Sequence, residues 1–196
     1  MNTRQAEIHR QTSETEVTLA LTLDGAGRAD VQTGIGFLDH LLITLARHAR
    51  FDLKLLCRGD LQVDDHHTAE DCALALGTAL DRALGERRGI TRFGYAYAPL
   101  DEALARAVVD LSGRALARVE LGLTREKLGE LACENIGHVL CSLASAARAT
   151  LHVDVLHGTN DHHRAEAAFK AVALALRQAT ARDGSGEIPS TKGVLG

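Results

Sequence analysis

Hydrophobic and polar residues alternate along segment 17–23, which reads Val-Thr-Leu-Ala-Leu-Thr-Leu. This two-residue period is typical of a strand with one buried face. The turn residues Asp24 and Gly25 end the strand, and segment 27–31 is a candidate hairpin partner for it.

A helical period follows. After the helix breakers of segment 33–36, apolar residues recur at three- and four-residue spacing, which predicts a helix over 38–49. Segment 51–56 then has the pattern of a strand. A second helix is predicted to start near Asp65 or Thr68 and to run to Leu84, because glycine, here Gly85, commonly follows a helix end.

The second half of the chain repeats this order. Each half is interpreted as three strands, a helix, a strand and a helix, which indicates a mixed α/β (α+β) fold. Segment 103–109 could also be helical by residue propensity alone. The elements predicted in this half are strands at 93–98, 103–110 and 115–120, a helix at 131–147, a strand at 151–155 and a helix at 162–181.

Residue matches between the halves support an internal duplication. Placing His66 on His162 aligns His67 with His163 and Glu70 with Glu166, and a short gap in the preceding loop aligns His40 with His138. A repeat of about 95 residues is too long for a solenoid unit and fits two similar halves. We therefore predict a first half over 1–90, a second half over 91–182, and a flexible arm rich in Gly, Ser and Pro over 183–196.

Composition argues against several classes of protein. The chain has a net charge of −4 and only 3% aromatic residues, which speaks against a nucleic-acid surface. No apolar run is long enough to span a bilayer and segment 1–5 does not start a signal peptide, so we expect no membrane partner and a cytoplasmic protein. The four cysteines form no C-x-x-C pair and are expected to be reduced structural residues.

Histidine is the unusual residue here: ten are present, and four of them form two adjacent pairs. Each pair opens a His-His-x-x-Glu motif, at 66–70 and at 162–166. Residues three or four positions apart share a helix face, whereas adjacent residues do not. Each pair is therefore expected to direct its imidazoles to different places, which indicates two metal sites per chain or sites completed by another chain.

Together with one upstream histidine in each half, the motifs supply six imidazoles and two carboxylates. They divide into two sites of three histidines and one glutamate, which leaves positions open on a six-coordinate ion. Nitrogen and oxygen donors without thiolates suit manganese or another divalent first-row metal. The candidate ligands are His40, His66, His67, Glu70, His138, His162, His163 and Glu166.

The other histidines have no duplicated partner. His9, His152 and His157 are interpreted as ordinary strand or surface residues. His48 is the one most open to a functional role, because it follows His40 by two helical turns.

Several longer motifs stand in a fixed order along nearly the whole chain. They are TGIGFLDH at 33–40, DDHHTAED at 64–71, ITRFG at 90–94, DLSGR at 110–114, NDHH at 160–163, EAAFKA at 166–171 and PSTKG at 189–193. With these motifs the sequence closely resembles the imidazoleglycerol-phosphate dehydratase family of histidine biosynthesis, in its monofunctional form.

The resemblance implies two four-stranded sheets with helices packed on one face of each. It also implies two manganese ions per subunit, and a homo-oligomer of 24 subunits in which the eight candidate ligands form metal centres between subunits. Glu14 would lie at the reacting carbons and His48 in the substrate pocket. The residues implied to hold the substrate phosphate are Arg92, Arg114, Lys170, Ser190 and Lys192.

The implied reaction removes water from D-erythro-imidazoleglycerol phosphate to give imidazole acetol phosphate. In this hypothesis the metal ions polarise the imidazole, Glu14 moves a proton, and the basic residues anchor the phosphate. The alternatives are a two-metal phosphate-ester hydrolase, which would release inorganic phosphate, and a non-catalytic metal-binding protein.

Overall fold

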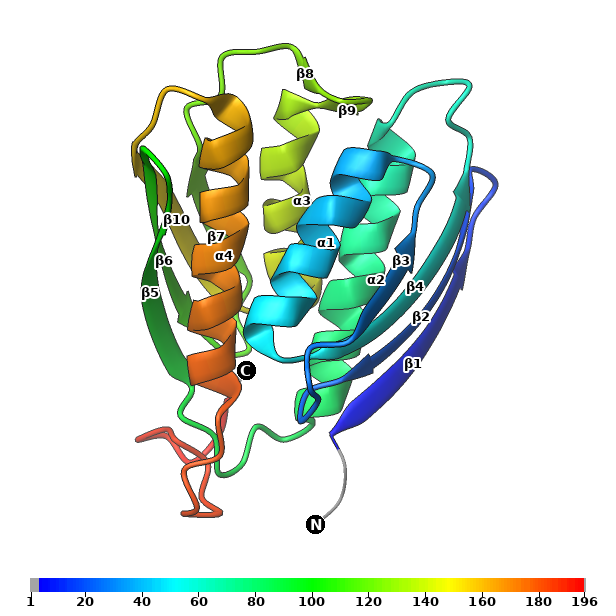
Figure 1. Cartoon of the computed structure of the whole chain (residues 1–196). Coiled ribbons are helices and arrows are strands. Elements are labelled where there is room, and N and C mark those ends of the chain that lie inside the picture. Colours follow the sequence, from blue (N-terminus) through cyan, green and yellow to red (C-terminus); the bar gives the residue numbers. More distant parts are fainter. Residues whose placement is uncertain (1–3, 196) are drawn as a thin grey trace.

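The computed structural model describes residues 4–195 of the chain. The first three residues of the predicted first half, and Gly196 of the predicted arm, lie outside the described residues. Two four-stranded sheets stand on either side of four helices, so that each sheet turns one face towards the helices and the other face outwards (Figure 1). The predicted mixed fold with two four-stranded sheets is therefore confirmed.

The first sheet has the strand order β1-β2-β4-β3. β2 is antiparallel to β1 and to β4, whereas β3 is parallel to β4. Helix α1 connects β3 to β4, and helix α2 follows β4. The bounds of these elements are β1 Gln5–Gln11, β2 Thr15–Thr22, β3 Ala29–Gln32, α1 Gly36–Ala49, β4 Asp52–Gly59 and α2 His66–Leu84.

The second sheet repeats this topology with the order β5-β6-β10-β7. β6 is antiparallel to β5 and to β10, and β7 is parallel to β10. A short hairpin, β8 and β9, precedes helix α3. The bounds are β5 Phe93–Leu100, β6 Ala103–Asp110, β7 Leu116–Glu120, β8 Lys127–Leu128, β9 Leu131–Ala132, α3 Cys133–Ala146, β10 Thr150–His157 and α4 Asp161–Thr180.

The predicted hairpin between 17–23 and 27–31 is wrong. The strand in the second segment, β3, pairs with β4 instead, because β2 already has β1 on one edge and β4 on the other. Asp52, at the start of β4, holds the segment that connects β2 to β3. Its Oδ1 accepts hydrogen bonds from the backbone N–H groups of Ala26 at 2.8 Å and Arg28 at 2.9 Å.

Two further differences follow from weak or mixed patterns. β1 was not predicted, because Ile8 is its only buried residue and the strand therefore has no clear alternation of apolar and polar residues. The strand predicted at 103–110 is confirmed over its helical alternative, because β6 pairs with a strand on each side. Residues 131 and 132 belong to β9, so α3 starts at Cys133 rather than at Leu131.

The helices join the two halves. α2 packs on α3 and α1 packs on α4, so the buried side chains of both sheets belong to one continuous core. Small residues allow the close approach of α2 and α3: a Cβ atom on Gly77 would lie 2.5 Å from the carbonyl oxygen of Leu143 and 2.7 Å from the Cβ of Ala146. Among the described residues, no helix combines the length and apolar character needed to cross a membrane.

Gly77 gives a test of this packing. In an open helix, alanine is favoured over glycine by about 1 kcal/mol. At Gly77 the added methyl group would force α2 and α3 apart, so we expect Gly77→Ala to lower the free energy of unfolding by about 1–3 kcal/mol. Urea unfolding of the metal-free protein, at one fixed protein concentration, measures this change.

Gly137 of α3 is the matched control, because the nearest atom to a Cβ placed there is a Val119 methyl carbon at 3.9 Å. We expect Gly137→Ala to leave stability unchanged or to raise it slightly. A Gly77→Ala variant as stable as the Gly137→Ala variant would contradict the described packing.

Candidate metal centre

All four helices begin at the same end of the molecule (Figure 1). The candidate ligands of the sequence analysis lie in the first two turns of these helices, so the fold brings them to one end. His40 is on α1, His138 on α3, and the two His-His-x-x-Glu motifs open α2 and α4.

The first cluster, here called the α2–α3 group, consists of His66, Glu70 and His138, whose ligand atoms lie within 4.8 Å of one another. His138 Nε2 is 3.1 Å from Glu70 Oε1. The His66 and His138 rings stack with their centroids 4.9 Å apart. His66 Nδ1 lies 3.0 Å from Asn135 Oδ1, which leaves Nε2 of this ring free.

The second cluster, the α1–α4 group, consists of His40, His162 and Glu166, whose ligand atoms also lie within 4.8 Å of one another. Glu166 Oε2 is 2.9 Å from His40 Nε2 and 3.3 Å from His162 Nε2. The ring of Phe37 packs against both imidazoles, with centroid distances of 5.9 Å to His40 and 5.0 Å to His162. Each group thus takes ligands from both halves of the chain.

The donor set of both groups fits a divalent metal ion. Two imidazole nitrogens and one carboxylate oxygen already converge in each group, and first-row divalent ions accept these donors. The groups contain no cysteine, which distinguishes them from structural zinc sites. Three protein ligands would leave several positions open on a six-coordinate ion.

Glu166 is the more buried of the two carboxylates, with a side chain 14% exposed against 36% for Glu70. Its Oε1 lies 2.8 Å from Lys170 Nζ, one helical turn further along α4. Burial opposes ionisation, but the hydrogen bonds with Lys170 and His40 outweigh it and lower the pKa of Glu166 to about 2. Glu166 is therefore an anion available to a cation at neutral pH.

Two aspartates fix the starts of the ligand-bearing helices. Asp65, just before α2, accepts a hydrogen bond from the backbone N–H of Ala132 at 2.7 Å. Asp161, the first residue of α4, accepts hydrogen bonds from the backbone N–H groups of Thr124 at 2.8 Å and Arg125 at 2.7 Å. Both aspartates directly precede a His-His pair, and both connect the start of their helix by hydrogen bonds to the segment between β7 and α3.

The second histidine of each pair points away from its group, as the helix geometry predicted. His67 Nδ1 lies 3.0 Å from Asp60 Oδ2, and His163 Nδ1 lies 2.7 Å from Glu102 Oε2. These hydrogen bonds raise the pKa of both histidines. They also help to hold the pKa of Glu102 well below its usual range. Within the described chain, neither histidine joins a three-residue cluster of potential ligands.

Glu14 and His48 lie near these clusters, Glu14 in a turn of the first sheet and His48 further along α1 from His40. Glu14, in the turn between β1 and β2, has Oε1 3.6 Å from His67 Nε2, and its side chain is 47% exposed. His48, in the last turn of α1, is half-buried. Burial and the positive charge of Lys170 lower the pKa of His48.

The predicted phosphate contacts are split between the two ends of helix α4. Lys170 lies beside the α1–α4 group, but the backbone N–H of Arg92 bonds to the carbonyl of Ala179, near the other end of α4. The sixteen residues from His163 to Ala179 correspond to about 24 Å along a helix. Arg92 also pairs with Asp110 through two hydrogen bonds, of 2.7 and 3.1 Å.

Three other predicted phosphate contacts lie at this far end. The carbonyl of Pro189, next to Ser190, accepts a hydrogen bond from Arg92 Nη1 at 2.7 Å, which holds the C-terminal segment beside Arg92. Lys192 follows in a turn, and its backbone N–H donates a hydrogen bond to Ser190 Oγ at 3.2 Å. The carbonyl of Arg114 accepts a hydrogen bond from Thr150 at the start of β10. The end of β10 leads into the start of α4, so Arg114 lies at the opposite end of this strand from the metal groups.

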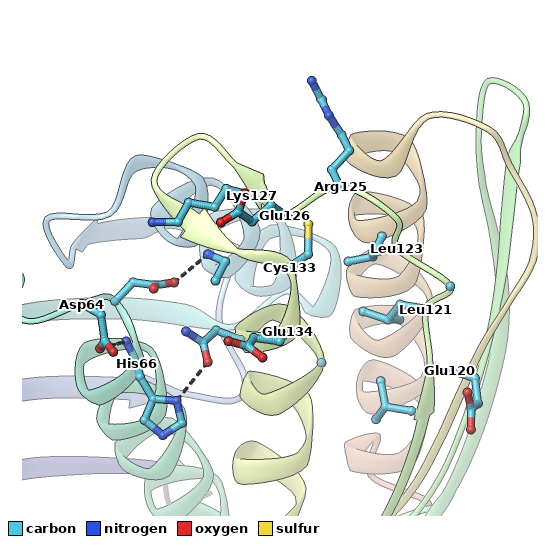
Figure 2. Close-up of a pocket in the computed structure, with 16 residues that line it drawn as sticks. Asp64, His66, Glu120, Leu121, Leu123, Arg125, Glu126, Lys127, Cys133 and Glu134 are labelled. Carbon is cyan, nitrogen blue, oxygen red and sulfur yellow. Dashed lines mark hydrogen bonds between the residues drawn. The ribbon is translucent and has the colours of Figure 1, made fainter.

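A cavity of about 790 Å³ opens beside the α2–α3 group. Figure 2 shows His66 and Glu134 on one side of it, with Leu121 and Leu123 on the other. His66 is the one member of the group that lines this cavity. Its volume lies within the range of small-molecule sites.

Three further residues, Asp60, Glu102 and Asn135, contact the candidate ligands and were not predicted from the sequence. Each of them contacts a candidate ligand from a distant position in the sequence or from another element, and none belongs to the His-His-x-x-Glu motif. His9, His152 and His157 are absent from the two groups.

Comparison with known sequences agrees with this arrangement. A sequence profile of the imidazoleglycerol-phosphate dehydratase family matches residues 33–176. The imidazoleglycerol-phosphate dehydratase of Eremothecium gossypii is 54% identical over 216 residues, covering 98% of this chain and 98% of that protein. The Schizosaccharomyces pombe enzyme is 53% identical and is covered over 100% of its length. The Phytophthora nicotianae protein is 60% identical, but this chain spans 42% of it.

Solved structures give the same result. The imidazoleglycerol-phosphate dehydratase of Staphylococcus aureus is 32% identical and superposes with a TM-score of 0.82, covering 91% of this chain and 99% of that one. The Pyrococcus furiosus protein, solved in complex with (S)-C348, is 36% identical with a TM-score of 0.83, covering 96% and 100%. By sequence and by fold, this chain belongs to the imidazoleglycerol-phosphate dehydratase family.

Proposed function

We propose that this protein removes water from D-erythro-imidazoleglycerol phosphate to give imidazole acetol phosphate, a hydro-lyase reaction of histidine biosynthesis. The observation that carries the proposal is the presence of two clusters of two histidines and one glutamate at one end of a fold shared with this family. In this reaction the carbon next to the ring loses its hydroxyl group and the neighbouring carbon loses a hydrogen. The resulting enol becomes the ketone.

We propose manganese as the metal, with two ions per subunit, one at each group. The nitrogen and oxygen donors support this choice. A bound divalent ion would act as a Lewis acid that polarises the substrate imidazole. The α2–α3 and α1–α4 groups would hold these ions.

We propose that His67 and His163 complete the metal centres of neighbouring copies of the chain, which would bring the ligand set to eight residues per subunit. The support is their orientation: both rings point away from the groups of their own chain, with Nδ1 engaged by a carboxylate. Their Nε2 atoms are then the donors available to a second copy.

Glu14 is our candidate for the residue that moves the proton. Its carboxylate is exposed and lies beside His67, so it would face a substrate held at a metal centre that His67 completes. His48 and Lys170 lie beside the α1–α4 group, where we place them in the substrate pocket. Lys170 would contribute positive charge for the phosphate.

We propose that the remaining phosphate contacts come from another subunit. Arg92, Ser190 and Lys192 lie near the C-terminal end of α4, about 24 Å along the helix from His163. A substrate of this size cannot span that length, so one site needs residues from two copies. This separation supports a homo-oligomer, which by family resemblance we take to have 24 subunits, and we place the enzyme in the cytoplasm.

Removal of one ligand tests the metal groups. We expect His138→Ala to weaken manganese binding at one of two centres by at least about 10-fold, because the remaining donors no longer fill the site. The measurement is isothermal titration of the metal-free protein with manganese(II). His152→Ala, on the exposed face of β10, is the control; equal binding by both variants would contradict the assignment of His138.

Glu14→Gln tests the chemical step. We expect turnover to fall by at least about 100-fold, because proton transfer by a positioned group contributes that much. Metal content and assembly should remain intact, since Glu14 belongs to neither group. The assay follows formation of imidazole acetol phosphate.

The control for this variant is Glu16→Gln, because Glu16 lies in the same hairpin and its carboxylate lies 3.4 Å from His9 Nε2, a residue of neither group. Near-normal turnover of the Glu14→Gln variant would contradict the role of Glu14. Release of inorganic phosphate by the unaltered enzyme would indicate the hydrolase, and absence of turnover with both metals bound would indicate a non-catalytic metal-binding protein.

Mixed assemblies test the sharing of sites between subunits. Glu14→Gln and Arg92→Ala subunits should each be inactive alone. If one chain supplies Glu14 and another supplies Arg92, random co-assembly should restore about a quarter of the normal activity, because one site in four then has both intact residues. Activity no higher than that of the separate variants would contradict the proposed sharing.

A further inference from the structure

Both outward-pointing histidines have a carboxylate on the same ring nitrogen. Asp60 Oδ2 lies 3.0 Å from His67 Nδ1, and Glu102 Oε2 lies 2.7 Å from His163 Nδ1. A ring N–H that donates to a carboxylate fixes the tautomer and orientation of an imidazole, and leaves the other nitrogen as a metal donor. In both cases the nitrogen left over is Nε2.

The two carboxylates do not occupy equivalent positions in the two halves. β2 pairs with β4 so that Thr22 faces Asp52, and β6 pairs with β10 so that Asp110 faces Thr150. Superposing these registers places Thr22 on Asp110, and therefore Glu14 on Glu102. The structural equivalent of Glu102 is thus Glu14, not Asp60.

The second half has no counterpart of Asp60. Asp60 directly follows β4, and the residues that follow β10 are Gly158 and Thr159, neither of which has a carboxylate. Glu102 performs the task there from the β5–β6 turn. Its Oε1 also accepts hydrogen bonds from the backbone N–H groups of Thr159 at 3.0 Å and Asn160 at 2.8 Å.

This difference separates the roles of the two hairpin glutamates. In the first half Asp60 occupies Nδ1 of His67, and Glu14 lies on the other side of the ring, 3.6 Å from Nε2. In the second half Glu102 is bound to Nδ1 of His163. Of the two hairpin glutamates, Glu102 is therefore bound to Nδ1 of its histidine, whereas Glu14 is not, because Asp60 occupies that position on His67.

We propose that Asp60 and Glu102 are positioning residues that orient His67 and His163 for metal binding, and that Asp60 thereby leaves Glu14 available for the reaction. The inference rests on the proposed function, in which these two histidines bind metal through Nε2. Asp101 does not take this role, because its carboxylate lies 3.9 Å from Nε2 of His163 rather than beside Nδ1.

The test is manganese(II) binding by the metal-free, full-length Asp60→Asn and Glu102→Gln variants, measured by isothermal titration. We expect each change to weaken metal binding by about 10- to 100-fold, as is typical when a residue that orients a metal ligand is lost. Glu14→Gln should bind manganese normally, although it occupies the position equivalent to Glu102. Normal binding by both Asp60→Asn and Glu102→Gln would overturn the inference.

Two exposed residues provide matched controls. Glu16→Gln removes a carboxylate beside His9, which belongs to neither group, and Asp30→Asn removes one that contacts Gln32. Both control variants should bind manganese as the unaltered protein does. Weakened binding by the controls would show that loss of surface charge explains the effect, and would overturn the inference.

Double variants separate orientation of a ligand from a structural effect. If Glu102 acts through His163, adding Glu102→Gln to His163→Ala should not weaken manganese binding further, and the same holds for Asp60 and His67. A further loss in the double variants would overturn the inference. If His67→Ala and His163→Ala bind manganese normally, the proposed ligand set itself fails, which is distinct from failure of the positioning role alone.

Discussion

Convergence of imidazole nitrogens and a carboxylate at the start of the helices is the constraint on which the rest of this structure depends. Neither group forms within one half: His138 of α3 meets the motif of α2, and His40 of α1 meets the motif of α4. The packing of α2 on α3 and of α1 on α4 sets these distances. A residue as remote as Gly77 therefore contributes to the geometry of the metal groups, because it lets two helices approach closely.

The same helix geometry sends two of the eight candidate ligands, His67 and His163, outwards. Adjacent residues on a helix differ by about 100° in direction, so one histidine of each pair faces its own group and the other cannot. The phosphate-binding candidates show a similar separation, because Arg92 lies at the opposite end of α4 from His163. Both features are accounted for by active sites that form between copies of the chain, which is our proposal.

Much of the fold was predictable because its helices and inner strands have strong hydrophobic periods. The His-His-x-x-Glu motifs also predicted that paired imidazoles diverge. Which histidine joins which glutamate was not predictable, because it depends on the packing of helices far apart in sequence. β1 gave no signal because only Ile8 is buried, and Asp60 and Glu102 were missed because their partners are determined by turns at the ends of strands.

Anomalous diffraction from crystals of the manganese-loaded protein tests the proposed ligand set most directly. Our account predicts two anomalous peaks per chain, one at the α2–α3 group and one at the α1–α4 group, each also contacted by His67 or His163 from a neighbouring chain. Peaks elsewhere, or peaks whose ligands all come from one chain with His67 and His163 unbound, would contradict it.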